Sequence, residues 1–154
     1  MIKDIFKIEN IVFDSTAKAK IDALKFIASF AEKEGIVKSS KAYYKGLKKR
    51  ESEVTTGFKD GIAIPHCKHK TVLKPSLMVV KFSNTVEWDS MDGKPVQITF
   101  ALAIPEGENQ AHLKLLSSIS RALIDEEFTE AILNAETESE MYAIIQEKMD
   151  KVND

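Results

Sequence analysis

The feature that most constrains the fold is a mostly apolar run near the middle of the chain, over residues 96–104. Its β-branched and aromatic residues predict a strand. A strand with one wet face alternates apolar and polar residues, whereas this run is apolar on both faces, which predicts a central strand covered on both sides. The chain therefore needs a sheet with helices packed against it.

Other segments have the residue types that are typical of strands and turns. Residues 62–64 and 77–82 are short apolar runs, and residues 8–13 contain enough apolar positions for one more short strand. Asp92-Gly93 is a turn signal ahead of the central run. Because hairpins as well as helices connect these segments, we expect a mixed rather than an all-parallel sheet.

Five helices are predicted from apolar stripes and from residues that begin or end helices. The first has Ser15 or Thr16 as its cap, an apolar stripe at Ile21, Leu24, Ile27 and Ala31, and Gly35 as its end; the second begins at a Ser39 cap, has Tyr43 and Leu47 on its buried side and runs to about Glu53. The third has its stripe at Leu116, Ile119 and Leu123. The last two cover residues 126–134 and 137–149, and Thr137 with Glu140 forms a capping box for the final helix.

Together these elements predict an α/β fold of mixed α+β type. We expect one domain over residues 1–154, with a mixed sheet of four to five strands between helices in α/β/α layers. A chain of this length can bury a core without disulfides or metals.

Composition narrows the functional classes. The 22 Lys and Arg nearly balance the 24 Asp and Glu, which argues against a general role on nucleic acid or anionic membranes. The single cysteine fits a reducing compartment, and no apolar stretch is long enough to span a bilayer. We therefore expect a cytoplasmic protein.

His66 is the first candidate for chemistry. It follows a short apolar strand and Pro65, which would hold it rigidly. Its imidazole is available as a nucleophile near neutral pH. Lysines flank it, and no acidic residue occurs between Gly61 and Val86, which favours an anionic partner such as a phosphoryl group. The alternative is a strand-end histidine that only makes structural hydrogen bonds.

His112 and Arg50 are the next candidates. His112 lies in the first turn of the third predicted strong helix, where free N–H groups and the helix dipole attract anions. Arg50 continues the buried stripe of the second helix towards the covered side. The alternatives are a surface histidine without a task and an arginine that snorkels to the rim.

Metal and other nucleophile schemes are weaker. His66, Cys67, His69 and His112 offer enough donors for zinc, but the flanking lysines repel a dication. We expect no metal and no cofactor, with His69 in a solvated loop and Cys67 as a bystander thiol. The sequence has no nucleophile elbow, phosphate loop or dinucleotide fingerprint.

The segment Thr55–His66, which reads TTGFKDGIAIPH, resembles enzyme IIA of the fructose/mannitol class in the bacterial phosphoenolpyruvate-dependent sugar phosphotransferase system. The likeness extends to Arg50-Glu51, to the stretch from Trp88 to Val96 and to His112-Leu113. It covers the chain from about residue 10 to residue 147.

The resemblance implies a role for each site residue. His66 matches the histidine that accepts a phosphoryl group from HPr and passes it to a cysteine of an enzyme IIB, for a sugar entering through a membrane enzyme IIC. His112 matches a second active-site histidine, Arg50 an arginine near the site, and Thr56 a hydroxyl residue that supports His66 or the phosphate. Lys68 stands where arginine is frequent, and it lacks the bidentate fork of arginine.

Two functions stay open at this point. The first is a phosphoryl relay in sugar uptake, with fructose, mannitol and galactitol among the sugars. The second is a nitrogen-type regulatory module, which receives phosphate on the matching histidine and acts by binding other proteins. The phosphorylated nitrogen of His66 and the oligomeric state are open too. For docking HPr we expect an exposed apolar rim around His66, with Ile62 and Ile64 beneath it.

Overall fold

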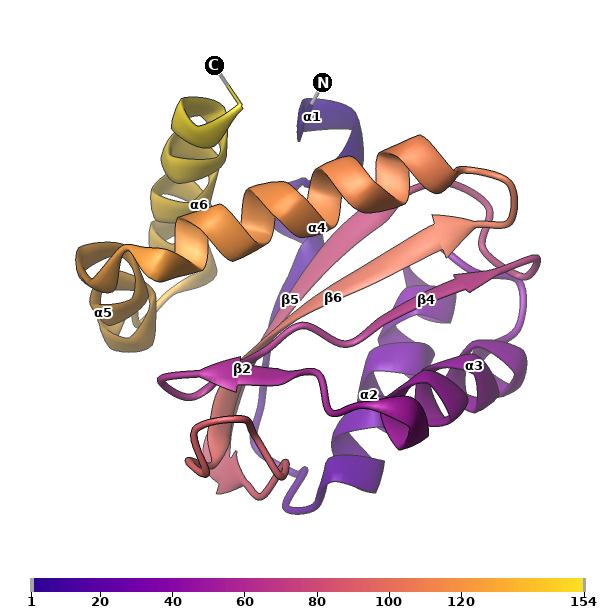
Figure 1. The fold of residues 1–154 in the computed structure, drawn as a ribbon, viewed down its shortest axis with the longest axis horizontal. Coiled ribbons are helices and arrows are strands. Elements are labelled where there is room, and N and C mark those ends of the chain that lie inside the picture. The colour runs from indigo at the N-terminus through magenta and orange to yellow at the C-terminus, as the bar shows by residue number, and fades with distance from the viewer. Residues whose placement is uncertain (1, 154) are drawn as a thin grey trace.

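The mostly apolar run forms strand β6, Val96–Pro105, at the centre of the sheet, as predicted. In this computed structural model, which describes residues 2–153, β6 pairs antiparallel with β5 (Ser76–Val86) along one side (Figure 1). Along its other side it pairs parallel with β3 (Ile62–Ala63) and then with β4 (His66–His69). Strand β1 (Ile11–Asp14) pairs parallel with β5, and β2 (Gly57–Lys59) pairs antiparallel with β3.

The predicted fold class and the mixed sheet are confirmed, and the sheet has six strands rather than four to five. The additional strands, β2 and β4, have the sequences GFK and HCKH, which lack the apolar runs that mark a strand. The helices in chain order are α1 (Ile2–Ile5), the 3₁₀ turn Ile8–Asn10, α2 (Lys20–Lys33), α3 (Ser40–Glu53), α4 (Asn109–Ile124), α5 (Glu126–Asn134) and α6 (Glu138–Val152).

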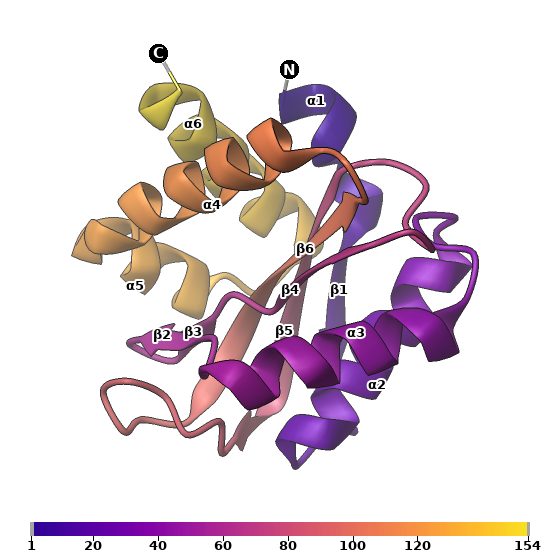
Figure 2. The ribbon, with the colours of Figure 1, turned by 45° about the vertical axis from the view of Figure 1, so that its right-hand side comes forward.

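Helices cover both faces of the sheet, which gives the predicted α/β/α layers. Helices α2 and α3 pack on one face, and α4, α5 and α6 pack on the other (Figures 1 and 2). The side chains of β6 alternate accordingly: Phe100 and Leu102 belong to the core under α4–α6, and Ala101 and Ala103 to the core under α2 and α3.

Strands β3 and β4 form one line along β6 with a break at Ile64-Pro65. Their registers agree, because Ile62 pairs with Ile98 and His66 pairs with Leu102. Within the break, the N–H of Ile64 donates to the carbonyl of Thr56 at 2.9 Å. Pro65 has no N–H, but its carbonyl accepts from Leu102 at 2.9 Å, so the chain rejoins β6 at His66.

Helix α2 begins later than predicted, and the expected cap at Ser15 or Thr16 is wrong. The residue before the helix is Ala19, which makes no side-chain cap. The carboxylate of Asp14 instead accepts the backbone N–H groups of Thr16, at 3.2 Å, and Ala17, at 2.8 Å, and so forms a turn. Ile21, which was expected in the buried stripe, is 43% exposed.

The other helix signals mostly agree with the structure. The hydroxyls of Ser39 and Thr137 accept the N–H groups of Ala42 and Glu140, each at 3.1 Å, as predicted for the caps of α3 and α6. Gly35 has a φ of 74° just after α2 ends. On α4 the expected stripe is shifted, because Leu115 is buried and Leu116 is only partly buried.

None of the helices in residues 2–153 combines the length and the apolarity needed to cross a bilayer.

Candidate active site

His66 is the first residue of β4, placed directly after the break in the strand line. Its side chain is buried, and its Nδ1 lies 2.7 Å from the carbonyl oxygen of Ile64. A carbonyl oxygen can only accept, so in the neutral imidazole Nδ1 carries the proton and Nε2 carries the free lone pair. The structure therefore leaves Nε2 as the ring nitrogen of His66 with a free lone pair, a detail that the sequence left open.

His112 lies beside His66, as expected from the first turn of α4. The centroids of the two rings are 5.4 Å apart, and the ring planes are tilted by 53°. The Nε2 of His112 is buried and has no hydrogen-bond partner among the described residues. A buried polar atom without a partner is costly, and this atom is available to hydrogen-bond a group that enters the cavity.

Both imidazoles are neutral near pH 7. Burial lowers the pKa of His66 below its usual 6.5, the Ile64 carbonyl opposes this shift, and the charge of Arg50 reinforces it. Burial also lowers the pKa of His112, and the charges of Lys68 and Arg50 add to the effect. Neutral imidazoles keep a lone pair for attack and do not hold a phosphoryl group by ionic attraction alone.

The two rings line a cavity of about 410 Å³ at the edge of the sheet. Because β4 is an edge strand, residues from α3 on one face and α4 on the other meet around it (Figure 2). Positive side chains outnumber negative ones on its wall. The lining residues are Gly46, Lys49, Arg50, Glu53, His66, Cys67, Lys68, His69 and His112.

Arg50 and Lys68 are each held by a neighbouring oxygen. The Nη1 of Arg50 donates to the carbonyl of Val54 at 2.7 Å, which folds the guanidinium over the end of its own helix. The Nζ of Lys68 donates to Asn109, the first residue of α4. Both cations line the same cavity as the histidines, where positive charge suits an anionic group.

Thr56 is buried, but it is not among the residues that line the cavity. Its hydroxyl donates to Oε1 of Glu51 at 2.5 Å and accepts from Nε1 of Trp88 at 3.2 Å. The structure therefore connects Thr56 to His66 through the backbone of Ile64 and not through its side chain. Glu51 is a residue that sequence reasoning missed, and its place next to Arg50 in the motif was the available signal.

The structure contradicts the prediction for His69 and agrees with the prediction for Cys67. The predicted solvated loop is wrong for His69, because residues 66–69 pair with β6, and its half-buried ring lines the same cavity. Burial raises the pKa of the Cys67 thiol to about 11, which leaves it protonated and unreactive. Cys67 packs against α3, where a Cβ on Gly46 would overlap its sulfur.

No group of three or more His, Cys, Asp or Glu side chains within residues 2–153 is arranged to hold a metal ion. The apolar rim expected around His66 stays a prediction. Ile62 and Ile64 are buried, as predicted, whereas Val54 and Leu113 are exposed. Val54 is the residue that holds Arg50, and Leu113 follows His112, so both lie near the cavity.

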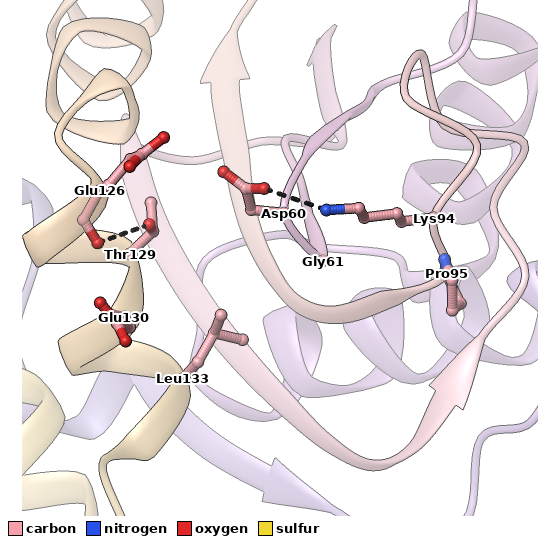
Figure 3. Close-up of a pocket in the computed structure, with 8 residues that line it drawn as sticks. All are labelled: Asp60, Gly61, Lys94, Pro95, Glu126, Thr129, Glu130 and Leu133. Atoms are coloured by element: carbon pink, nitrogen blue, oxygen red, sulfur yellow. Dashed lines mark hydrogen bonds and ion pairs between the residues drawn. The ribbon is translucent and has the colours of Figure 1, made fainter.

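A second, larger cavity of about 520 Å³ lies between the β2–β3 turn and α5 (Figure 3). Figure 3 shows the carboxylates of Asp60, Glu126 and Glu130 around it, with Lys94 paired to Asp60 at 3.6 Å. Its lining contains no histidine, cysteine or arginine. A wall with three carboxylates and one lysine repels an anion such as a phosphoryl group, so the smaller cavity is the candidate active site.

Comparisons with known proteins agree with this arrangement. The family model for "Phosphoenolpyruvate-dependent sugar phosphotransferase system, EIIA 2" matches residues 4–148. The PTS system fructose-specific EIIA component of Haloferax volcanii is 32% identical over 146 residues, which are 95% of each chain. The fructose-specific EIIABC component of Bacillus subtilis is 32% identical over 144 residues, and there this chain spans 94% of its own length but only 23% of the relative.

A solved structure extends the comparison. The crystal structure of nitrogen regulatory protein IIA-Ntr from Neisseria meningitidis has a TM-score of 0.86 and 28% identity to this chain. The match covers 94% of this chain and 98% of that one. The chain is thus similar both to sugar-specific EIIA components and to a nitrogen regulatory protein.

Proposed function

This chain belongs to the EIIA 2 family of the phosphoenolpyruvate-dependent sugar phosphotransferase system, and on that premise we propose that His66 carries its phosphoryl group. The protein is then a phosphohistidine carrier, a phosphotransferase component of a relay. The observation that carries the proposal is the hydrogen bond from His66 Nδ1 to the Ile64 carbonyl, beside a His112 Nε2 that has no partner within residues 2–153. It leaves one free lone pair and one unused polar atom facing the same cavity.

In the accepting step, the lone pair of His66 Nε2 attacks the phosphorus of a phosphohistidine on HPr. A new P–N bond forms as the P–N bond of the donor breaks, and its electron pair returns to the donor nitrogen. Three equatorial oxygens carry the charge of this transition state. We assign His112 Nε2 and Arg50 as the groups that hydrogen-bond these oxygens, with Lys68 adding positive charge.

In the donating step, a cysteine thiolate of an enzyme IIB attacks the same phosphorus. The P–N bond to His66 breaks, and its electron pair returns to Nε2, which restores the neutral imidazole. The site must bind its phosphoryl group weakly enough to release it, and two neutral imidazoles with few cations meet that condition. Thr56 is proposed to support His66 indirectly, because its carbonyl accepts the N–H of Ile64, whose own carbonyl contacts the imidazole. The relay is proposed to operate in the cytoplasm.

The test uses enzyme I, HPr and phosphoenolpyruvate with the full chain. We expect the intact mass to rise by one phosphoryl group, with the phosphate on Nε2 of His66, and His66→Ala to remain unlabelled. His112→Ala should still accept phosphate but transfer it about 10²-fold more slowly, because one transition-state hydrogen bond is lost. Labelling of His66→Ala, or unchanged transfer in His112→Ala, contradicts the assigned roles.

A regulatory function is the second candidate, and the similarity to IIA-Ntr from Neisseria meningitidis favours it. The two functions differ in the fate of the phosphoryl group once His66 carries it. The phosphorylated chain is mixed with enzyme IIB proteins of the fructose and mannitol classes. Rapid loss of phosphate to an IIB cysteine supports the sugar relay, whereas retention with every IIB tested supports the regulatory module.

A further inference from the structure

The carboxylate of Glu51 is a buried charge with several donors around it. Glu51 lies in the last turn of α3, and its side chain is only 6% exposed. Oε2 accepts from the N–H of Thr56 at 2.8 Å, from Nε1 of Trp88 at 3.1 Å and from Nζ of Lys20 at 3.1 Å. Oε1 accepts from the hydroxyl of Thr56 at 2.5 Å. A buried carboxylate needs partners of this kind, since an unpaired one would be strongly destabilising.

Two of these four bonds go to one residue, which fixes the backbone of Thr56. The carbonyl of Thr56 then accepts the N–H of Ile64 at 2.9 Å. The carbonyl of Ile64 in turn lies 2.7 Å from Nδ1 of His66. A continuous series of hydrogen bonds therefore runs from the Glu51 carboxylate to the imidazole of His66.

The break between β3 and β4 makes the imidazole depend on this series. Ile64 lies at the break, where the pairing of β3 with β6 ends at Ala63 and that of β4 with β6 begins at His66. The position of its carbonyl is then set by the bond to Thr56 and by the neighbouring Pro65. If Thr56 shifts, the acceptor for Nδ1 shifts with it, and the imidazole loses the bond that selects its tautomer.

We infer that Glu51 is a positioning residue for phosphoryl transfer: through Thr56 and the Ile64 carbonyl it holds His66 in the tautomer that presents Nε2 to the cavity. This inference rests on the proposed function of His66. Glu51 itself is outside the lining of the cavity, so its hydrogen bonds reach His66 through the backbone, while its charge also raises the pKa of His66 slightly against the lowering by burial.

The test is Glu51→Gln in the full chain. A glutamine offers one uncharged oxygen where Oε2 accepts from three donors, so the hold on Thr56 weakens. Long-range proton–nitrogen NMR spectra report the tautomer of each imidazole, and the chain has only three histidines to assign. In the wild type we expect Nδ1 of His66 to be protonated. In Glu51→Gln the two nitrogen shifts should move towards a common average.

The rate of phosphoryl acceptance from phospho-HPr is measured on the same samples. We expect Glu51→Gln to lower kcat by about tenfold with little change in KM for HPr, because the productive tautomer is less populated and docking is unaffected. The matched control is Glu32→Gln. Glu32 also accepts a backbone N–H, that of Ser40 at 2.7 Å, and Ser40 lies at the end of α3 opposite to Glu51. The control should keep both the tautomer and the rate of the wild type.

An unchanged tautomer in folded Glu51→Gln overturns the inference, and so does a changed tautomer with an unchanged rate. If Glu51→Gln does not fold, Thr56→Val and Thr56→Ser carry the same test. Val removes the hydroxyl bond to Glu51 and should mix the tautomers, whereas Ser keeps the hydroxyl and should restore the wild-type spectrum and rate. If the wild type takes up no phosphate on His66, the proposed function fails, while the NMR measurement still decides the positioning.

Discussion

At the scale of single residues, the site depends on two imidazoles that stay neutral. The pKa of each lies below the usual 6.5, with burial as the main cause. Between the lowered pKa and 6.5 the unfolded chain binds more protons than the folded chain. The stability that the two histidines contribute is therefore complete above about pH 6.5 and is lost as the pH falls through that window.

The charges of Arg50 and Lys68 lead to a prediction that distinguishes the pKa of His66 from that of His112. Arg50 lowers the pKa of both His66 and His112, whereas Lys68 is among the causes for His112 only. We expect Arg50→Gln to raise the NMR titration midpoints of both imidazoles. Lys68→Gln should raise that of His112 and leave that of His66 in place. Equal effects of the two variants on both rings would contradict the charge arrangement described here.

At the scale of elements, the site needs close contact between α3 and β4. Gly46 permits this contact, because a Cβ at that position would overlap the sulfur of Cys67 and lie 3.8 Å from its Cβ. Arg50 is one turn further along α3, so the distance between helix and strand also sets where the guanidinium lies. Cys67, an inert thiol, thus contributes to the site through packing.

Gly46→Ala tests this contact. Alanine favours a helix over glycine by about 1 kcal/mol, but overpacking against Cys67 costs about 1–3 kcal/mol, so we expect a net loss of stability. In a Cys67→Ala background the sulfur is absent, and the same change should become neutral or stabilising. Urea unfolding of the four proteins gives the coupling energy. Additivity within about 0.5 kcal/mol would mean that the two residues do not compete for space.

At the scale of the whole molecule, the cavity that contains His66 and the larger cavity lie at different places around the sheet. The active site forms where the helical layers meet around edge strand β4, whereas the larger cavity is walled by α5 and the β2–β3 turn (Figures 2 and 3). Size alone would select the larger cavity. Chemistry selects the cavity that contains two neutral histidines and positive charge.

Substitutions in the larger cavity test this choice. Lys94→Gln and Glu130→Gln change charges on its wall without touching the active site. We expect both variants to accept phosphate from phospho-HPr at the wild-type rate, while Arg50→Gln slows it by about tenfold or more. A comparable loss of rate in Lys94→Gln would show that the larger cavity takes part in transfer or in docking.

Local patterns in the sequence were enough to find the central strand at residues 96–104, the caps at Ser39 and Thr137, and His66, Arg50 and His112 as candidates. These signals can be read from the chain because apolar periodicity and capping depend on residues a few positions apart. The family assignment followed from one ordered set of motifs and is confirmed by the family match.

Which groups meet is a property of the folded chain alone. The Nδ1 bond of His66, the place of His69 in the cavity and the role of Glu51 depend on contacts between distant segments and on one break in a strand. Local patterns also failed at Thr16, where the carboxylate of Asp14 competed successfully for the N–H groups that a helix start would use. These groups are only two and three residues apart, so the local residue types allowed either turn, and the path of the folded backbone decided between them.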